Sequence, residues 1–244
     1  MNFAFDQNCR RCPRLAGFLD GVKTEFPEYH ARPVSPFGAA NPKLLIVGLA
    51  PGMHGANRTG RPFTGDHAGI LLYQTLHKFG FATAPESVSR DDGLELIDCR
   101  ITNAVKCLPP DNKPETSEVV MCNGFLAAEL ADLSEGTAVL ALGNVAHGAV
   151  LRALKLKAKD FPFVHGASYK LPQRRQDALT PTPHITPSPF GRGHGVREGE
   201  GEKAGLILYD SYHCSRYNTN TRRLTQPMFE AVFAQIKEDL SCPM

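Results

Sequence analysis

Four cysteines are spaced in a way that could hold a metal. Two residues separate Cys9 from Cys12, and fourteen residues separate Cys107 from Cys122. Two thiolates at the first spacing can bind one metal centre from a single turn, and the second pair could close the site at long range. Four thiolates suit either a structural Zn²⁺ or a [4Fe–4S] cluster, and the spacing does not choose between them. The remaining cysteines fit ordinary buried thiols; they are Cys99, Cys214 and Cys242.

A long loop rich in glycine and proline runs from Gly48 to Asp66. Glycine lets the backbone approach a ligand closely and exposes N–H groups. Arg58 and Arg61 could reach phosphates, and Phe63 offers a flat face for a base. No Gly-Lys-Ser/Thr follows and no G-x-G-x-x-G is present, so the loop is neither a P-loop nor a dinucleotide fingerprint. A purely structural loop with an incidental carboxylate remains the alternative.

A histidine, His213, follows an apolar run near the C-terminus. A lone histidine in such a place is often structural. Here an aromatic residue, three arginines and two asparagines follow it, and this composition suits contact with a nucleic-acid backbone and groove. The residues concerned are Arg216, Tyr217, Asn218, Asn220, Arg222 and Arg223.

The elements that must position these residues alternate between strands and helices. Short apolar runs, typical of strands buried on both faces, occur at residues 44–49, 100–105, 138–142 and 206–209. Helical spacing of apolar residues occurs at 68–79, 116–130 and 228–240, and Glu115 to Glu118 can cap the second helix. Such alternation predicts a parallel sheet covered on both faces, with ligands beyond the carboxyl ends of its strands.

Composition narrows the class of protein. The 244 residues include 42% hydrophobic and 21% charged residues, with a net charge of +2, which suits one α/β domain without a basic coat. No apolar run reaches the roughly 18 residues of a membrane span. The N-terminus lacks an export signal, so we expect a cytoplasmic protein with reduced cysteines. Residues 172–203 are rich in Pro, Gly, Arg and Glu, and we interpret them as a flexible insertion.

Three segments together resemble a known family. They are G-L-A-P-G-x-H-G-x-N-R-T-G-R-P-F-T-G-D at 48–66, C-x-P-P-x-N-K-P at 107–114 and S-Y-H-x-S-R-x-N-T-x-T-x-R-L-T at 211–225. In this order they resemble the family-5 (type B) uracil-DNA glycosylases, relatives of the family-4 enzymes with iron–sulfur clusters. The resemblance covers nearly the whole chain outside the insertion.

The resemblance implies a single domain over residues 1–244, a three-layer α/β/α fold around a four-stranded parallel sheet. It also implies a [4Fe–4S] cluster with a structural role on Cys9, Cys12, Cys107 and Cys122. The implied activity is that of a monofunctional glycosylase in base excision repair. Such an enzyme hydrolyses the N-glycosidic bond of uracil, and of other deaminated bases such as hypoxanthine and xanthine, and leaves an abasic site.

The resemblance further implies roles for single residues. Phe63 would stack on an extruded base and Asn103 would hydrogen-bond its edge. His213, neutral and donating, would stabilise negative charge on the departing base, and Asp66 and Asn112 would position water and stabilise the sugar cation. The residues implied on DNA are Arg58, Arg61, Arg216, Tyr217, Asn218, Arg222 and Arg223.

Gly52 stands where related families carry a catalytic side chain, so water activation falls to other residues and the base pocket gains room.

The expected partner is double-stranded DNA, with single-stranded DNA as a second form. We expect a monomer that is associated with the nucleoid through DNA.

Two rival functions remain. A metal-bearing module that only recognises damage would need neither Asp66 nor His213, and a small-molecule hydrolase would leave the C-terminal Arg/Asn/Thr run unexplained.

Overall fold

A computed structural model of the chain describes residues 4–172 and 205–241. The predicted insertion at 172–203 therefore lies, apart from Pro172, outside the described residues. Within these ranges every helix falls short of the length and apolar character that crossing a bilayer requires.

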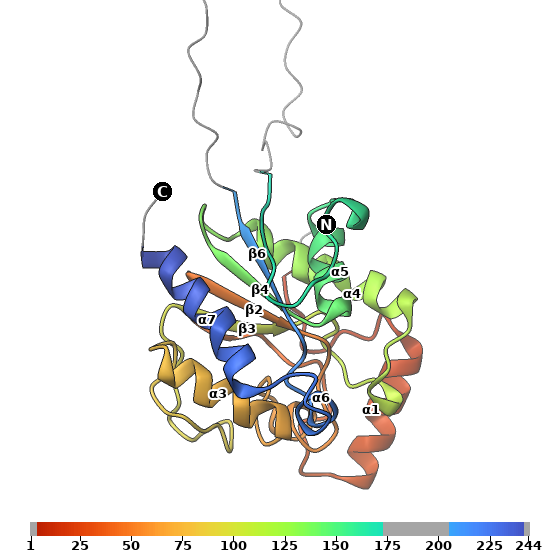
Figure 1. Cartoon of the computed structure of the whole chain (residues 1–244). Coiled ribbons are helices and arrows are strands. Elements are labelled where there is room, and N and C mark those ends of the chain that lie inside the picture. The colour runs from red at the N-terminus through yellow and green to blue at the C-terminus, as the bar shows by residue number, and fades with distance from the viewer. Residues whose placement is uncertain (1–3, 173–204, 242–244) are drawn as a thin grey trace, which may run out of the picture.

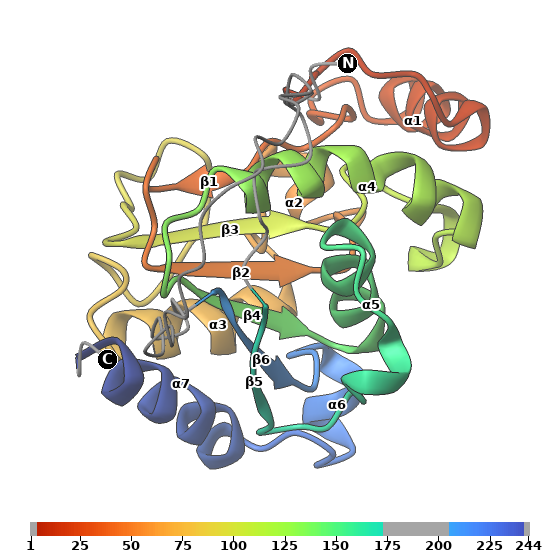
Figure 2. The same cartoon turned by 90° about the horizontal axis from the view of Figure 1, so that it is seen from above.

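Among the described residues, the centre of the fold is one sheet of six strands in the order β1-β3-β2-β4-β6-β5 (Figures 1 and 2). The strands are β1 (Phe37–Gly38), β2 (Leu44–Gly48), β3 (Cys99–Asn103), β4 (Ala138–Leu142), β5 (Ser168–Lys170) and β6 (Ile207–Ser211). The four inner strands are parallel, and β1 and β5 pair antiparallel at the two edges. The predicted α/β class is confirmed. The predicted strand number of four is wrong, because it describes only the parallel centre.

Helices cover both faces of the sheet. They are α1 (Pro13–Glu25), α2 (Ala56–Thr59), α3 (His67–Lys78), α4 (Thr116–Ala131), α5 (Asn144–Ala153), α6 (Arg216–Asn220) and α7 (Gln226–Ser241), with 3-10 turns η1 (Pro110–Asn112) and η2 (Ala158–Asp160). In Figure 2, α3 and α7 lie on one side of the sheet and α4 and α5 on the other.

Strand β2 shows why the layers form. Every residue of it is buried. Because successive side chains of a strand point to opposite faces, Leu44 and Ile46 enter the apolar cluster shared with α3 and α7, whereas Leu45 and Val47 enter the cluster shared with α4 and α5. The continuous apolar run is thus the consequence of burial on both faces.

The start of α4 follows the predicted capping pattern. The Glu115 side chain accepts from the backbone at Glu118, and the Glu118 carboxylate accepts the Glu115 N–H at 2.7 Å. These bonds satisfy N–H groups that have no partner inside the helix. They fix where α4, which carries Cys122, begins.

Helix α1 lies apart from the sheet, beyond α4 in Figure 2. Its Leu19 and Val22 pack with Tyr29 and Leu108 in a small separate cluster. This helix follows the first cysteine pair directly, so the segment that carries Cys9 and Cys12 is held against the region after β3.

Candidate active site

Phe63 and His213 meet at the carboxyl edge of the sheet. Phe63 lies in the loop after β2, and His213 lies two residues after β6. Their rings are stacked with centroids 5.7 Å apart and an interplanar angle of 27°. Gly143, which follows β4 between them, has φ of +95°, and a Cβ there would lie 3.6 Å from the His213 Cβ. The loops after three neighbouring strands thus converge on one point.

Asn103 joins this group from the end of β3. A Cβ on Gly48 would lie 2.4 Å from the Asn103 Oδ1 and 2.7 Å from the Phe63 ring, so only glycine allows the two side chains to flank this position. Asn103 is 3% exposed. Its Oδ1 has no hydrogen-bond partner in the part of the chain that the structure describes. A buried acceptor without a partner costs free energy, and a bound ligand would remove that cost.

Asp66 forms the next wall of the site. It is the N-cap of α3, and its Oδ1 accepts the Gly69 N–H at 2.9 Å. Its Oδ2 faces the backbone of two glycines: a Cβ would lie 2.5 Å from it at Gly55 and 3.7 Å at Gly52. Burial raises the pKa of Asp66, although the amides of Gly69 and Ala68 act in the opposite direction. The carboxylate is therefore held close to glycine backbone and is partly shielded from water.

His213 is neutral at physiological pH, because burial lowers its pKa to about 4. The Asn218 Nδ2 donates to the His213 carbonyl at 2.8 Å and ties it to α6. Phe63 has φ of +55°, a left-handed conformation that is strained for an aromatic residue. Strain of this kind gathers at functional sites.

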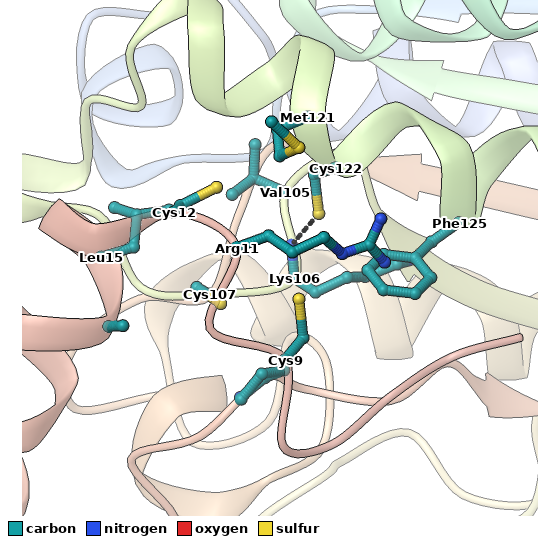
Figure 3. A pocket seen from close by; sticks show the side chains of 12 residues that line it. Cys9, Arg11, Cys12, Leu15, Val105, Lys106, Cys107, Met121, Cys122 and Phe125 are labelled. Carbon is teal, nitrogen blue, oxygen red and sulfur yellow. Dashed lines mark hydrogen bonds between the residues drawn. The ribbon is translucent and has the colours of Figure 1, made fainter. Parts of the chain in front are cut away.

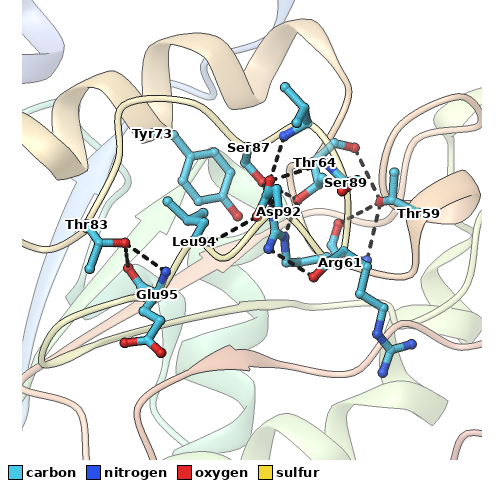
Figure 4. Close-up of polar contacts among 12 residues, drawn as sticks. Thr59, Arg61, Thr64, Tyr73, Thr83, Ser87, Ser89, Asp92, Leu94 and Glu95 are labelled. Carbon is cyan, nitrogen blue, oxygen red and sulfur yellow. Dashed lines mark hydrogen bonds and ion pairs between the residues drawn. The ribbon is translucent and has the colours of Figure 1, made fainter.

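Arg61 corrects one sequence-based expectation. It is 3% exposed, and its guanidinium donates to Asp92 Oδ2 and to Ser87 Oγ, both at 2.5 Å. Figure 4 shows it inside a network with Thr64 and the loop before β3. A guanidinium buried and paired in this way does not reach a phosphate, so the expected DNA contact at Arg61 does not fit the structure.

The C-terminal segment lies beside the site and is exposed. Arg216 is the first residue of α6, and the Tyr217 side chain is 71% exposed. Arg222 and Arg223 are also exposed, and the Arg223 guanidinium lies 4.7 Å from the centroid of the Tyr212 ring. Among the other residues expected on DNA, Arg58 is exposed, whereas the Asn218 amide is engaged with the His213 carbonyl.

Asn112 lies on η1 with φ of +55° and is exposed. Within the described residues no hydrogen bond joins it to Asp66 or to His213. Phe63, Asn103, Asp66 and His213 have contacts around this edge of the sheet, and the role expected for Asn112 stays a prediction.

The four predicted cysteine ligands line one pocket between α1, α4 and the segment after β3 (Figure 3). The Lys106 backbone N–H donates to the Cys122 Sγ at 3.3 Å. Burial, and then the neighbouring thiols, raise the pKa of Cys12 to about 11 and that of Cys107 to about 12. The described residues contain no group of three or more His, Cys, Asp or Glu side chains placed to hold a metal ion.

Comparison with known proteins decides the family. The family model of the uracil DNA glycosylase superfamily matches residues 35–237. The chain belongs to this superfamily.

Individual relatives place this superfamily member among the type-5 uracil-DNA glycosylases. The one from Thermus thermophilus is 40% identical over 234 residues, which cover 94% of this chain and 92% of the relative. The one from Pyrobaculum aerophilum is 39% identical over 239 residues, covering 96% and 90%. A type-4 uracil-DNA glycosylase from Pyrobaculum aerophilum is 30% identical over 165 residues, covering 67% and 70%.

Besides Arg61–Asp92, two more buried pairs of this glycosylase-family chain were not foreseen from its sequence. His147 pairs with Asp210 at 2.7 Å, and Lys106 pairs with Glu129 at 2.6 Å and also donates to the Thr102 hydroxyl. The available signal was a charged residue inside or next to an apolar run. That signal shows that a partner is needed and does not say which residue supplies it.

Proposed function

We propose that this chain is a DNA repair glycosylase, a hydrolase that cleaves the N-glycosidic bond of uracil in DNA and leaves an abasic site. The observation that supports this most is the convergence of Phe63, Asn103, Asp66 and His213 beyond the carboxyl ends of the parallel strands. A bond inside a duplex can be reached only when the nucleotide is turned out of the stack. A ring, an amide, a carboxylate and an imidazole at one point suit such an extruded base.

Base recognition falls to Phe63 and Asn103. The Phe63 ring stacks on the flat face of uracil. The buried Asn103 Oδ1, which lacks a partner in the described part of the chain, accepts the N3–H of uracil, and the amide N–H₂ donates to the neighbouring carbonyl oxygen. The cost of leaving that oxygen unpaired is removed when the correct base enters.

His213 acts on the departing base. As the bond between N1 and C1′ breaks, the electron pair stays with uracil, and a neutral imidazole N–H donates to the O2 oxygen where negative charge gathers. One preorganised donor of this kind contributes about 3–4 kcal/mol to lowering the barrier. The low pKa of His213 keeps the ring neutral, so it donates a hydrogen bond without transferring a proton.

Asp66 acts on the sugar. Its ionised carboxylate stabilises positive charge on C1′ and takes a proton from the water whose oxygen bonds to that carbon. Because Gly52 and Gly55 carry no side chain, the Asp66 Oδ2 can lie close to their backbone. Asn112, on an exposed turn, is proposed as a further polar group that reaches the sugar once DNA is bound.

The proposed cofactor is a [4Fe–4S] cluster on Cys9, Cys12, Cys107 and Cys122. Four thiols lining one pocket, together with an N–H bond to one of the sulfurs, suit a cluster. When bound, the cluster would supply a structural crosslink between the segment before α1, the segment after β3 and helix α4.

The proposed partner is double-stranded DNA, with single-stranded DNA as a second form, bound by a monomer. The exposed side chains beside the site supply the contacts, namely Arg58, Arg216, Tyr217, Arg222 and Arg223. Tyr217, at 71% exposure, is suited to enter the minor groove, while the arginines contact phosphates.

The test is an excision assay on duplex oligonucleotides that carry one uracil, one hypoxanthine, one xanthine or one mismatched thymine. We expect uracil to be released as free base, with strand breakage only after alkali treatment. Because Gly52 has no side chain beside Asp66, we also expect release of hypoxanthine and xanthine. If the protein binds uracil-containing DNA but releases no base, it is a damage-recognition module and not an enzyme. If it releases uracil alone, the broader substrate range is rejected.

A further inference from the structure

His147 and Asp210 form a buried pair behind His213. The Asp210 side chain, on β6, is 0% exposed, and His147, on α5, is 2% exposed. The His147 Nδ1 lies 2.7 Å from Asp210 Oδ1, and its Nε2 lies 2.8 Å from the Phe161 carbonyl oxygen. The second carboxylate oxygen accepts the Val164 N–H at 3.3 Å. The pair therefore joins α5, β6 and the segment from 161 to 166.

Both ring nitrogens of His147 face oxygen atoms. A carbonyl oxygen only accepts, and a carboxylate that already accepts from Val164 is also an acceptor. A neutral imidazole has one N–H and could satisfy only one of these oxygens. The geometry is therefore satisfied by an imidazolium that donates in both directions. Burial lowers the pKa of His147, but the hydrogen bond to Asp210, the charge of Asp210 and the bond to the Phe161 carbonyl together outweigh it and raise that pKa.

The segment that this pair holds reaches the backbone next to His213. The backbone of residue 210 exchanges hydrogen bonds with Gly166 and Ala167 at 2.9 and 3.0 Å. His165 in the same segment accepts the Tyr212 N–H at 3.2 Å, and its ring stacks on the Tyr212 ring at 4.8 Å and 8°. Tyr212 directly precedes His213, whose own carbonyl is held by Asn218.

We propose that the His147–Asp210 pair is a positioning device for His213: it clamps segment 161–166 against the end of β6 and so fixes the backbone from which His213 points at the departing base. This inference rests on the proposed function for its kinetic part only. His147 and Asp210 do not touch the base pocket and are positioning residues.

Two other titratable groups lie close to the pair. His165 and Tyr169 both interact electrostatically with Asp210, and the Tyr169 ring lies 6.5 Å from that of His147. His165 has its pKa lowered by burial, so it stays neutral and able to accept the Tyr212 N–H. The positive charge at this place therefore belongs to His147.

The kinetic test compares His147→Gln with Tyr209→Phe. Glutamine can donate to one of the two oxygens but does not bridge both. The control removes another buried hydrogen bond of β6, from the Tyr209 hydroxyl to Asp239 Oδ2 at 2.6 Å, on the α7 side of the sheet. In steady-state excision of uracil we expect kcat to fall roughly tenfold in His147→Gln, because displacing a reacting group by about 1 Å can cost more than this. We expect KM to change less than about twofold and the control to match the wild type.

Two readouts on the unaltered protein do not depend on excision or on how a variant folds. Nitrogen chemical shifts of His147 should show both ring nitrogens protonated at neutral pH. Amide exchange at Tyr212 should lose protection as pH rises through the pKa of His147, while the amide of Ile207, bonded to the Thr137 carbonyl, keeps its protection. If the wild type releases no uracil, the proposed function fails while these readouts still test the clamp.

The clamp is overturned by any of three results. One is a His147 ring with a single protonated nitrogen at neutral pH. Another is a Tyr212 amide whose protection from exchange changes with pH in the same way as that of the Ile207 amide. The third is a folded His147→Gln variant whose kcat equals that of the wild type.

Discussion

Burial shifts the pKa values of His213 and Asp66 in opposite directions. For the imidazole, burial disfavours the charged form and keeps the ring a neutral donor. For the carboxyl, burial raises the pKa, so the ionised form that the chemistry needs is lost at a higher pH than for an ordinary aspartate. The acid side of the reaction's pH profile therefore contains contributions from both Asp66 and His213.

The pH profile of excision should show both groups. As pH falls, kcat for uracil release should decline as Asp66, whose pKa is raised, takes up a proton. Protonation of His213, whose pKa is about 4, removes the neutral donor on the acid side as well. The residual activity of Asp66→Asn should keep only the part of the decline that comes from His213. A decline that persists unchanged in Asp66→Asn would assign it to another group.

At the scale of elements, the loop after β2 is held by a buried ion pair. Arg61 and Asp92 join this loop to the segment before β3 (Figure 4). Burial alone would raise the pKa of Asp92, but bonds from Arg61 and from backbone N–H groups outweigh it and hold the pKa well below its ordinary value. A carboxyl with a lowered pKa stabilises the fold above its unfolded pKa, and that stability is lost as pH falls through the folded value.

Asp92→Asn should therefore destabilise the protein in a pH-dependent way. At neutral pH we expect the free energy of unfolding to fall by about 3 kcal/mol, because the substitution leaves the Arg61 charge buried without its partner. The difference from the wild type should shrink as pH falls below about 4. Thermal melts at several pH values measure this. An equal difference in Tm at every pH would show that the charge of Asp92 is not what stabilises the loop.

Substitutions of Arg61 and Arg222 distinguish an arginine that stabilises the fold from one that contacts DNA. Arg222 is exposed beside the site, whereas Arg61 is buried. Arg222→Gln should lower the slope of log Kd against log salt by about one unit, since one phosphate contact is lost. Arg61→Gln, examined below its melting temperature, should keep the wild-type slope. A reduced slope in Arg61→Gln would show that Arg61 contacts a phosphate of DNA.

Elements differed in how well the sequence predicted them. The buried strands were predicted within one or two residues, because continuous apolar runs follow from burial on both faces. Strands β1 and β5 have two and three residues, too few to give a period. Arg61 was misjudged because its partner, Asp92, is distant in sequence and nothing local reveals the pairing. For the same reason the His147–Asp210 pair was missed, whereas Phe63, Asp66 and His213 stood within recognisable motifs.

At the scale of the molecule, the proposed cluster joins segments that are far apart in the chain. Cys122→Ser should lose the broad absorption near about 400 nm that a [4Fe–4S] centre gives, and with it resistance to heat. Cys99→Ala is the matched control, since Cys99 is also a buried thiol but lies in β3 away from the pocket. Purified wild-type protein that binds zinc and is colourless would reject the cluster.

The central claim is that His213 acts on the departing base in a pocket shared with Phe63 and Asp66. The most direct measurement is single-turnover uracil release by His213→Ala, together with its affinity for abasic DNA. His77→Ala, an exposed histidine in the last turn of α3, is the control. We predict that release slows by roughly 10²-fold or more while abasic-DNA affinity stays close to that of the wild type. Equal losses of release and affinity would contradict the account, since they would make His213 a DNA-binding residue only.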